Sequence, residues 1–213
     1  MPAELPQAYL RGLFDDYAAR FDKHLTGALG YRGPRLIFSA LRRACVMTER
    51  RFLFPRAIDL GCGTGLMGVA LKGRVGEMTG VDLSPAMLRE AAKTKCYVSL
   101  TEGDMTQALD DAREEFDLIT AADALVYAGD LAPFCAAAAR ALTGDGLAAF
   151  SVQSRADGDF SLGPELRFSH SQSYLRRVLA AAALTPVLLE AASTRQDKGV
   201  DVPGLICVAR RAP

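Results

Sequence analysis

A short run of glycines constrains the fold of this chain more than any other feature. Residues 57–60 read Ala-Ile-Asp-Leu, and Gly61-Cys62-Gly63-Thr64-Gly65 follows directly. An apolar run, a glycine turn and a helix-compatible string together predict a strand, a sharp turn and the start of a helix. Glycine permits positive φ and lets a ligand approach the backbone. The helix that follows offers free N–H groups and a partial positive charge.

This stretch fits two ligand-binding patterns. Gly63, Gly65 and Gly68 match the dinucleotide fingerprint G-x-G-x-x-G. Gly61, Gly63 and Gly65 match the G-x-G-x-G turn of S-adenosylmethionine enzymes. A tight turn that binds no ligand is the third interpretation, because a lone glycine fingerprint is a weak signal. The choice depends on residues further along the chain.

Strands and helices alternate after residue 56. The pattern predicts strands at 57–60, 78–83, 97–101, 116–121 and 146–153, with helices at 66–72, 84–95, 107–112 and 131–142 between them. Such alternation predicts a parallel sheet with helices on both faces. Beyond residue 153 we expect a loop (154–168), a helix (172–183), a strand (186–190), a polar connection (191–203) and a last strand (204–210). Two strands without a helix between them indicate an antiparallel pair at the sheet edge.

Composition narrows the classes of partner. The 25 Lys and Arg balance the 25 Asp and Glu, so the basic face that a nucleic-acid partner requires is not expected. The five cysteines are scattered, which favours neither a disulfide framework nor a metal site. No apolar run reaches membrane-spanning length and no leader pattern begins the sequence. We therefore expect a cytoplasmic protein with no metal and no membrane contact.

Four acids follow four successive predicted strands. Asp59 closes the first and Asp82 the second, Asp104 follows the third and Asp123 follows the fourth. In a doubly wound sheet the ligand lies across the carboxyl ends of the strands, so these side chains are expected to face it.

Three of these acids suit different parts of one ligand. Asp82 can accept both hydroxyls of a ribose in charge-assisted hydrogen bonds. Asp104 could accept from an adenine amino group, with Met105 against the ring. Asp59 suits a cationic ammonium and would repel a pyrophosphate. The set favours S-adenosylmethionine, which carries an ammonium and a sulfonium but no phosphate.

Three segments resemble, in order, the cofactor-binding motifs of class I S-adenosylmethionine-dependent methyltransferases. They are Asp59-Leu60-Gly61-Cys62-Gly63-Thr64-Gly65, Val81-Asp82-Leu83-Ser84-Pro85-Ala86-Met87-Leu88 and Glu102-Gly103-Asp104. Residues 13–25, Tyr31-Arg32-Gly33-Pro34 and His170-Ser171 further resemble a bacterial subgroup often fused to tetratricopeptide repeats, although no such repeats occur in this sequence.

The resemblance implies a fold and a set of cofactor contacts. The fold is an α/β, Rossmann-like doubly wound, mostly parallel seven-stranded sheet with an antiparallel edge strand and an N-terminal helical lid. One domain spans residues 1–213, divided into a lid (1–50), a cofactor-binding core (56–153) and a substrate-side loop, helix and closing strand pair (154–213). The cofactor-binding residues expected are Tyr17 and Phe21 of the lid, Asp59, Gly61, Cys62, Gly63, Gly65, Asp82, Leu83, Met87, Gly103, Asp104, Met105 and Ala121.

The acceptor side of the site is harder to predict. Methyl transfer is an in-line displacement, so positioning and the exclusion of water are the protein's main tasks. A base is needed only for an acceptor that carries a proton on the attacking atom. The candidates are Asp123 and Tyr127 after the fourth strand and His170 after the fifth. Arg155 and Arg167 flank the substrate-side loop and could pair with an acidic molecule.

We therefore expect S-adenosylmethionine-dependent O- or N-methylation of a small molecule, an acidic metabolite being one candidate class. Residues 121–124, Ala-Ala-Asp-Ala, lack the Asn/Asp-Pro-Pro-aromatic sequence typical of enzymes that methylate exocyclic amines of DNA or glutamine amides. An NAD-binding oxidoreductase and a non-catalytic S-adenosylmethionine-binding module are the alternatives. The sequence does not indicate an oligomeric state.

Overall fold

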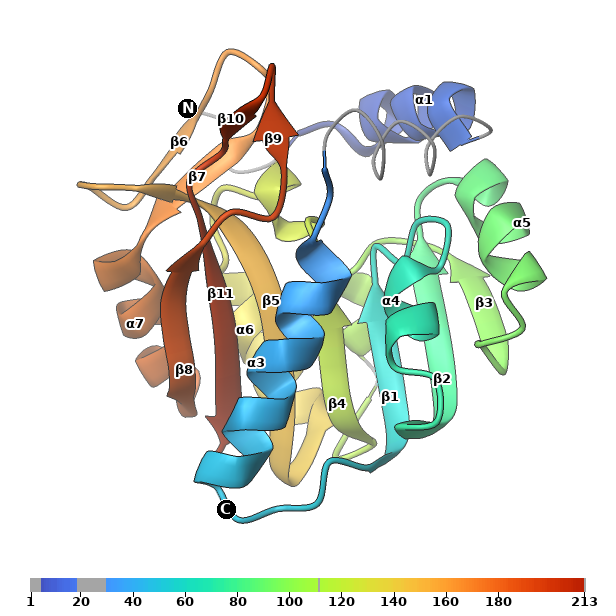
Figure 1. Cartoon of the computed structure of the whole chain (residues 1–213), viewed down its shortest axis with the longest axis vertical. Coiled ribbons are helices and arrows are strands. Elements are labelled where there is room, and N and C mark those ends of the chain that lie inside the picture. Colours follow the sequence, from blue (N-terminus) through green and yellow to red (C-terminus); the bar gives the residue numbers. More distant parts are fainter. Residues whose placement is uncertain (1–4, 19–29, 111, 213) are drawn as a thin grey trace.

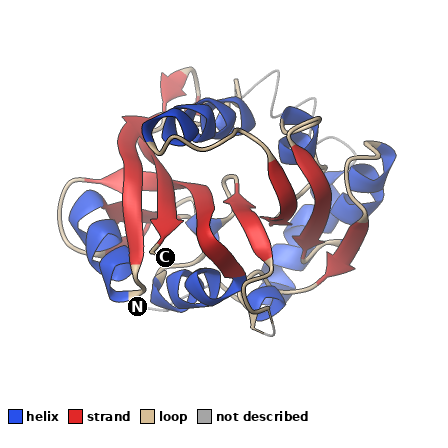
Figure 2. Ribbon diagram, turned by 90° about the horizontal axis from the view of Figure 1, so that it is seen from below, coloured by secondary structure: helices blue, strands red, loops and turns tan. Residues whose placement is uncertain are grey.

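A twisted sheet runs through the middle of the molecule, and helices cover both of its faces (Figures 1 and 2). The computed structural model describes residues 5–18, 30–110 and 112–212. In the first half of the chain the elements are α1 (Gln7–Tyr17), α3 (Gly33–Met47), β1 (Phe54–Leu60), α4 (Leu66–Ala70), β2 (Val75–Asp82), α5 (Pro85–Lys93), β3 (Ser99–Glu102) and the 3-10 turn η3 (Gln107–Leu109). In the second half they are β4 (Phe116–Ala121), the 3-10 turn η4 (Leu125–Tyr127), α6 (Ala132–Ala141), β5 (Leu142–Arg155), β6 (Phe160–Leu162), β7 (Phe168–Ser171), α7 (Gln172–Ala181), β8 (Leu184–Ala192), β9 (Gln196–Asp197), β10 (Val200–Asp201) and β11 (Gly204–Arg211).

The strand order of the main sheet is β3-β2-β1-β4-β5-β11-β8. β1 pairs in parallel with both β2 and β4, whereas β11 runs antiparallel to β5 and β8. The predicted Rossmann-like, mostly parallel sheet with an antiparallel strand is therefore confirmed. That strand, β11, lies one position in from the edge, and β8 forms the edge itself. The strand order reverses between β1 and β4, and in open α/β sheets ligands bind in the crevice beside such a switch point.

Both faces of the sheet are buried, which explains the long apolar runs in its strands. Along β5, Ala148 and Phe150 belong to the core beneath α6 and α7. The alternate residues Leu147 and Ala149 belong to the core beneath α3 and α4. Side chains of a strand point alternately to its two faces, so one strand contributes to both layers.

Two predicted connections contain short strands. Residues 154–168 were expected to form a loop, but β6 lies within them, and β7 begins at Phe168 and pairs in parallel with β5. Residues 191–203 include β9 and β10, which form a two-stranded hairpin. These predictions were wrong because two to four residues give too little periodicity to identify a strand. These segments form strands because they pair with other strands, which the local sequence does not indicate.

The N-terminal helix α1 lies across the carboxyl ends of the strands, at the top of Figure 1. Within the segment 1–50 that was expected to be helical, α1 begins at Gln7, and residues 19–29 lie outside the described part of the chain. Asp15 accepts hydrogen bonds from Ser84 Oγ (2.6 Å) and Ala86 N (3.2 Å) at the start of α5. These bonds hold the pKa of the Asp15 carboxyl below its usual value.

A second set of contacts ties the middle of α1 and the residues before it to the sheet. Arg11 Nη1 lies 2.8 Å from Glu102 Oε1 at the end of β3. Leu5 N donates to Tyr127 O (3.2 Å) beyond β4. The helix is therefore attached to the sheet on both sides of the switch point.

Candidate functional site

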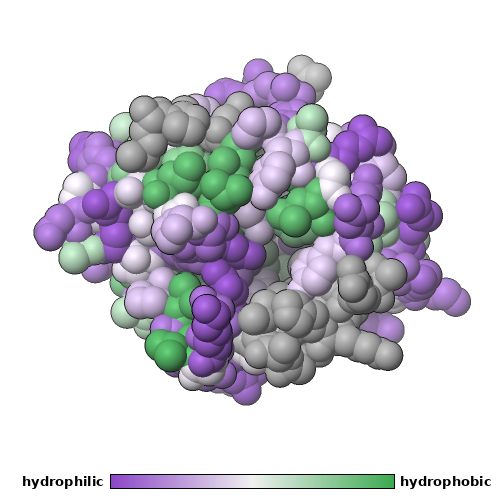
Figure 3. Space-filling view, turned by 90° about the horizontal axis from the view of Figure 1, so that it is seen from above, coloured by the Kyte–Doolittle hydropathy of each residue, from purple (hydrophilic) through white to green (hydrophobic). Residues whose placement is uncertain are grey.

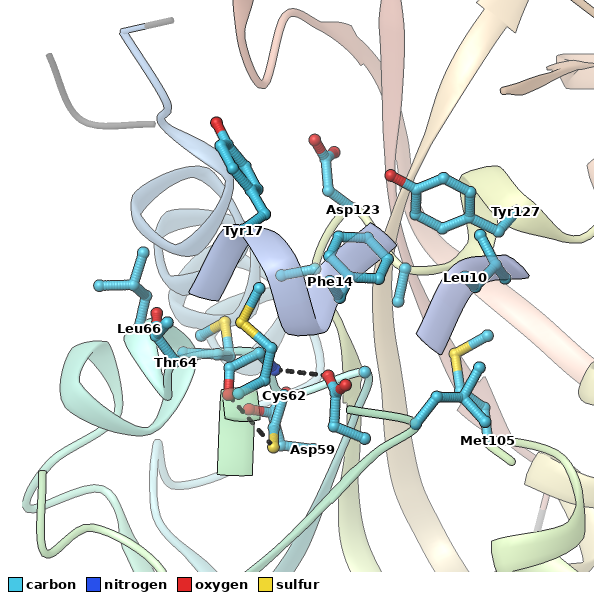
Figure 4. Close-up of a pocket in the computed structure, with 18 of the residues that line it drawn as sticks. Leu10, Phe14, Tyr17, Asp59, Cys62, Thr64, Leu66, Met105, Asp123 and Tyr127 are labelled. Carbon is cyan, nitrogen blue, oxygen red and sulfur yellow. Dashed lines mark hydrogen bonds between the residues drawn. The ribbon is translucent and has the colours of Figure 1, made fainter. Parts of the chain in front are cut away.

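A cavity of about 320 Å³ lies beneath α1, within the size range of small-molecule sites. Figure 3 shows this face of the molecule, where apolar residues lie among hydrophilic ones, and Figure 4 shows the side chains that surround the cavity. The lining residues are Leu10, Leu13, Phe14 and Tyr17 of α1; Tyr31 and Pro34 at the start of α3; Asp59, Gly61, Cys62, Gly63, Thr64, Leu66 and Met67 around the glycine loop; Asp82, Leu83, Met87 and Met105; and Ala122, Asp123, Ala124, Tyr127 and Arg167.

The glycine loop has the geometry that its composition predicts. Gly61, Gly63 and Gly65 have φ values of +63°, +53° and +89°, which L-residues rarely adopt. At Gly61 space is limiting as well, because an added Cβ would lie 2.5 Å from the Cβ of Ala124. The loop therefore packs directly against the segment that follows β4, and the two halves of the cavity meet there.

Asp82 fixes the loop from the end of β2. Its Oδ2 accepts from Gly63 N (2.8 Å) and its Oδ1 accepts from Ser84 N (2.9 Å). Burial raises the pKa of this carboxyl, while the two N–H donors oppose the rise. Each oxygen keeps a further lone pair, so the group can accept two hydroxyls of a ligand in the cavity.

Asp59 lies at the end of β1 and is almost fully buried, with 1% of its surface exposed. Thr120 Oγ1 donates to its Oδ1 (2.8 Å) and the Tyr97 hydroxyl donates to its Oδ2 (2.8 Å). Burial raises its pKa to about 7 despite these two donors. A cation in the cavity would stabilise the ionised carboxylate, so the site favours a positively charged ligand group.

The expected adenine-binding acid, Asp104, does not line the cavity. Its Oδ1 accepts from Thr106 N (2.8 Å) and Gln107 N (3.0 Å), and Gln7 Nε2 of α1 donates to its Oδ2 (3.1 Å). The carboxylate thus holds the turn that leads into η3 and connects that turn to α1. Its neighbour Met105 does line the cavity, as expected.

The lid contributes more of the cavity wall than the sequence indicated. Tyr17 lines the cavity as expected, and Leu10, Leu13 and Phe14 line it too. The ring of Phe14 packs edge-on against the ring of Tyr127, with centroids 5.5 Å apart. These residues were not predicted because an apolar stripe on a helix does not show what it covers. The other expected lid residue, Phe21, lies outside the described residues.

On the far side of the cavity, Asp123 is held in one orientation. It has φ +56°, an uncommon conformation that aspartate tolerates better than most residues. Its Oδ1 accepts from Ser151 Oγ (3.1 Å) and Thr194 Oγ1 (2.8 Å). Its Oδ2 lies 3.8 Å from Arg167 Nη1. Three segments distant in sequence therefore converge on this carboxylate.

Arg167 brings a positive charge into the same part of the cavity. Its guanidinium carbon lies 5.1 Å from the centre of the Tyr127 ring. Its Nη1 is buried, and among the described residues it has no hydrogen-bond partner. Burial raises the pKa of the Tyr127 hydroxyl, so that hydroxyl stays protonated at neutral pH. An anionic group of a ligand could accept a hydrogen bond from this nitrogen and pair with the charge of the guanidinium.

Tyr31 is a lining residue that the sequence did not single out. Burial raises the pKa of its hydroxyl well above its usual value, and Asp123 and Asp59 add to the rise. Its side chain folds back over Gly33, where an added Cβ would lie 2.5 Å from the hydroxyl oxygen. The sequence Tyr31-Arg32-Gly33-Pro34 was noted for its resemblance to a subgroup, and that was the available signal.

The expectation that His170 faces the acceptor is wrong in this structure. The residue is fully buried in β7 and does not line the cavity. Its Nε2 lies 2.9 Å from Gly129 O, and its ring stacks against Tyr174. Burial lowers its pKa. His170 therefore faces the core, because the residues expected to form a loop pair as β6 and β7.

The structure brings most of the predicted residues together. The predicted residues that line the cavity are Tyr17, Asp59, Gly61, Cys62, Gly63, Asp82, Leu83, Met87, Met105, Asp123 and Tyr127. Those that lie outside its wall are Gly65, Gly103, Asp104, Ala121 and His170. Among the described residues no group of three or more His, Cys, Asp or Glu could hold a metal ion. None of the described helices combines the length and the apolar character needed to cross a membrane.

Comparison with known proteins identifies the segment that carries the glycine loop. Residues 57–146 match the family model of the methyltransferase domain. The chain is 38% identical over 77 residues to magnesium-protoporphyrin O-methyltransferase of Rhodobacter capsulatus, covering 34% of this chain and 33% of that protein. It is 29% identical over 179 residues to ubiquinone biosynthesis O-methyltransferase of Methylococcus capsulatus, covering 78% and 71%. The match thus spans a third of the length of the first of these relatives, and it spans half of the ubiquinone biosynthesis O-methyltransferase of Alkalilimnicola ehrlichii, which is 28% identical over 137 residues.

Two further comparisons bear on the fold and on the partner. The Burkholderia thailandensis 1,6-didemethyltoxoflavin-N1-methyltransferase, solved with 1,6-didemethyltoxoflavin and S-adenosylhomocysteine, superposes with a TM-score of 0.72 at 20% identity, over 100% of this chain and 93% of that one. The 18S rRNA (guanine-N(7))-methyltransferase of Bos taurus is 37% identical over 78 residues, 37% of this chain and 27% of that protein. The expected exclusion of nucleic acid, drawn from net charge, is therefore not supported.

Proposed function

We infer that this chain is a class I S-adenosylmethionine-dependent methyltransferase, and we propose that it methylates an oxygen or nitrogen of a small acidic molecule. The observation that carries the proposal is the charge distribution around the cavity. Asp59 and Asp82 flank the glycine loop, whereas Arg167, the one cation among the described lining residues, lies beside Asp123 and the Tyr127 ring. Two carboxylates beside the loop favour an ammonium and a ribose over a pyrophosphate.

The residues present fit the cofactor. When bound, S-adenosylmethionine supplies an electrophilic methyl group on a sulfonium. Asp82 would accept the ribose hydroxyls, Asp59 would pair with the ammonium, and the glycine backbone would lie along the ligand. The apolar side chains Leu10, Phe14 and Met105 would exclude water, which strengthens electrostatic interactions in the site. The subgroup resemblance adds no acceptor to this proposal.

The third glycine of the dinucleotide pattern does not decide between the two cofactors, because in either case its role is close packing. Gly68 completes the G-x-G-x-x-G pattern, yet an added Cβ there would lie 2.7 Å from the Tyr97 ring. Gly68 N also donates to the Tyr97 hydroxyl (3.1 Å). Packing against Tyr97 therefore accounts for Gly68, and the choice of cofactor depends on Asp59, which would repel a pyrophosphate.

The acceptor side favours an anion. Arg167 Nη1 lies 3.8 Å from Asp123 Oδ2 and has no hydrogen-bond partner among the described residues. It can therefore pair with a carboxylate or a phenolate, and the Tyr31 and Tyr127 hydroxyls can donate to the same group. An acceptor that arrives ionised needs no base. Where the attacking atom carries a proton, Asp123 is the carboxylate nearest to Arg167 and would take it. O-methyltransferases among the relatives support an oxygen acceptor.

The test is transfer of a radiolabelled methyl group from S-adenosylmethionine to a panel of small acceptors. The panel pairs each phenol or carboxylic acid with its neutral amide or ether, and a structured RNA is included. Labelling of the acids and not of their neutral partners is the expected result. Labelling of the RNA alone would show that the acceptor is a nucleic acid and not a small acidic molecule. Binding of the cofactor with no transfer to any acceptor would favour the non-catalytic module.

A further inference from the structure

Tyr97 lies behind the glycine loop, between α5 and β3, and does not line the cavity. Three glycines make room for its ring. A Cβ added at Gly65, Gly68 or Gly80 would lie 3.1, 2.7 or 3.0 Å from a ring atom. Two of these glycines belong to the segment after β1 and the third to β2, where Gly80 is the residue paired with Asp59. The loop and the strand are thus shaped around this one side chain.

The Tyr97 hydroxyl connects the loop to the buried acid. It donates to Asp59 Oδ2 (2.8 Å) and accepts from Gly68 N (3.1 Å). Burial raises the pKa of this phenol, so it stays protonated and keeps its role as donor. One hydroxyl therefore fixes both the Asp59 carboxylate and the first turn after the loop.

The other Asp59 oxygen has its own donor, and the carboxylate is held on both sides. Thr120 Oγ1 donates to Oδ1 (2.8 Å) from the neighbouring strand β4. Leu100, Cys62 and the Tyr97 ring fill the space that Gly80 leaves on β2 beside Asp59. Each Asp59 oxygen keeps a further lone pair, and Asp59 is among the residues that line the cavity.

We propose that Tyr97 is a positioning residue that makes the site select ligands with an α-amino group, through its hold on Asp59. The inference rests on the proposed cofactor and extends it to a residue outside the cavity wall. Without the hydroxyl, Asp59 would lose one of its two anchors and the loop would lose the acceptor for Gly68 N. The part of the ligand affected would be the amino acid, because the adenosine would contact other residues, Asp82 and Met105 among them.

The test compares two ligands in a Tyr97→Phe variant. S-adenosylhomocysteine has both an adenosine and an amino acid, whereas 5′-methylthioadenosine has the adenosine and the sulfur without the amino acid. The phenylalanine ring still fills the slot between the glycines. We expect S-adenosylhomocysteine to bind roughly 10-fold more weakly by titration calorimetry, as for loss of a hydrogen bond to a charged group. Binding of 5′-methylthioadenosine should change by less than about two-fold.

Tyr174→Phe is the matched control. The Tyr174 hydroxyl also donates to a carboxylate, Asp130 Oδ1 (2.8 Å), and accepts from a backbone donor, Leu131 N (2.7 Å). Because it makes the same two kinds of hydrogen bond, Tyr174→Phe should lose a comparable amount of stability. Because Tyr174 lies outside the cavity wall, this variant should keep the wild-type ratio of the two affinities. An equal loss for both ligands in Tyr97→Phe, or no loss for either, would overturn the inference. Failure of the wild-type protein to bind S-adenosylhomocysteine would instead overturn the proposed function on which the inference rests.

Discussion

The polar groups in one half of the cavity come from neighbouring segments of the chain, and those in the other half come from segments far apart in sequence. On the cofactor side, Asp59, the glycine loop and Asp82 lie within one strand–helix–strand unit. On the acceptor side, Tyr31, Asp123 and Arg167 come from three separate segments. The first half is fixed by local backbone geometry and the second by how distant segments pack. Changes on the cofactor side should therefore affect cofactor binding strongly, and changes on the acceptor side should leave it almost intact.

The largest expected effect is on the cofactor side. Asp82→Ala removes the carboxylate that anchors Gly63 N and would accept the ribose. We expect S-adenosylhomocysteine binding to weaken by about 1.5–3 kcal/mol, roughly ten- to 150-fold. Titration calorimetry measures it, with Asp157→Ala, a change at an exposed carboxylate, as the control. An unchanged dissociation constant in the folded Asp82 variant would show that this acid is only a turn residue.

Gly61→Ala tests the point where the two halves meet. The substitution places a Cβ 2.5 Å from that of Ala124 and puts alanine at φ +63°. We expect the free energy of unfolding to fall by roughly 1–3 kcal/mol, measured by urea denaturation. Gly144→Ala is the control, since nothing lies within 4 Å of a Cβ added there. Equal stability of the two variants would mean that the halves are not packed as described.

The pH dependence of binding is a smaller effect from the same side. The pKa of Asp59 is about 7, and a bound ammonium favours its ionised form. Asp59 is therefore ionised above its pKa of about 7, where the affinity is highest, and the affinity is lost as the pH falls through this value. Between about pH 8 and about pH 6, S-adenosylhomocysteine binding should weaken roughly ten-fold. Asp59→Asn should bind more weakly with little pH dependence. A wild-type affinity that does not change over this range would show that the ammonium does not pair with Asp59.

The smallest effect on cofactor binding is expected from the acceptor side. Arg167→Gln removes the cation that would hold an acidic acceptor, and it leaves the glycine loop in place. S-adenosylhomocysteine affinity should change by less than about two-fold, while the KM for any acidic acceptor should rise about ten-fold or more. Arg140→Gln, a change at an exposed arginine, is the matched control. A large loss of cofactor affinity in Arg167→Gln would show that the two halves are not separable.

The same difference explains what could be predicted from the sequence. The glycine loop was identified because a turn with positive φ requires glycine at fixed spacing, and Asp59 and Asp82 because they end successive strands. Arg167 was named only as one of two loop arginines and Tyr31 was not assigned to the site, because only the tertiary fold brings them together. The short strands β6 and β7 were missed, and with them the burial of His170. Tyr97 was read only as the start of a strand, since no local pattern shows that it packs against three glycines.

The central claim is that the cavity between the glycine loop and α1 holds S-adenosylmethionine. Titration calorimetry of the wild-type protein with S-adenosylhomocysteine and, separately, with NAD tests it most directly. The account predicts a dissociation constant on the order of micromolar for S-adenosylhomocysteine, which is about −8 kcal/mol, and no comparable binding of NAD. Preference for NAD would contradict it.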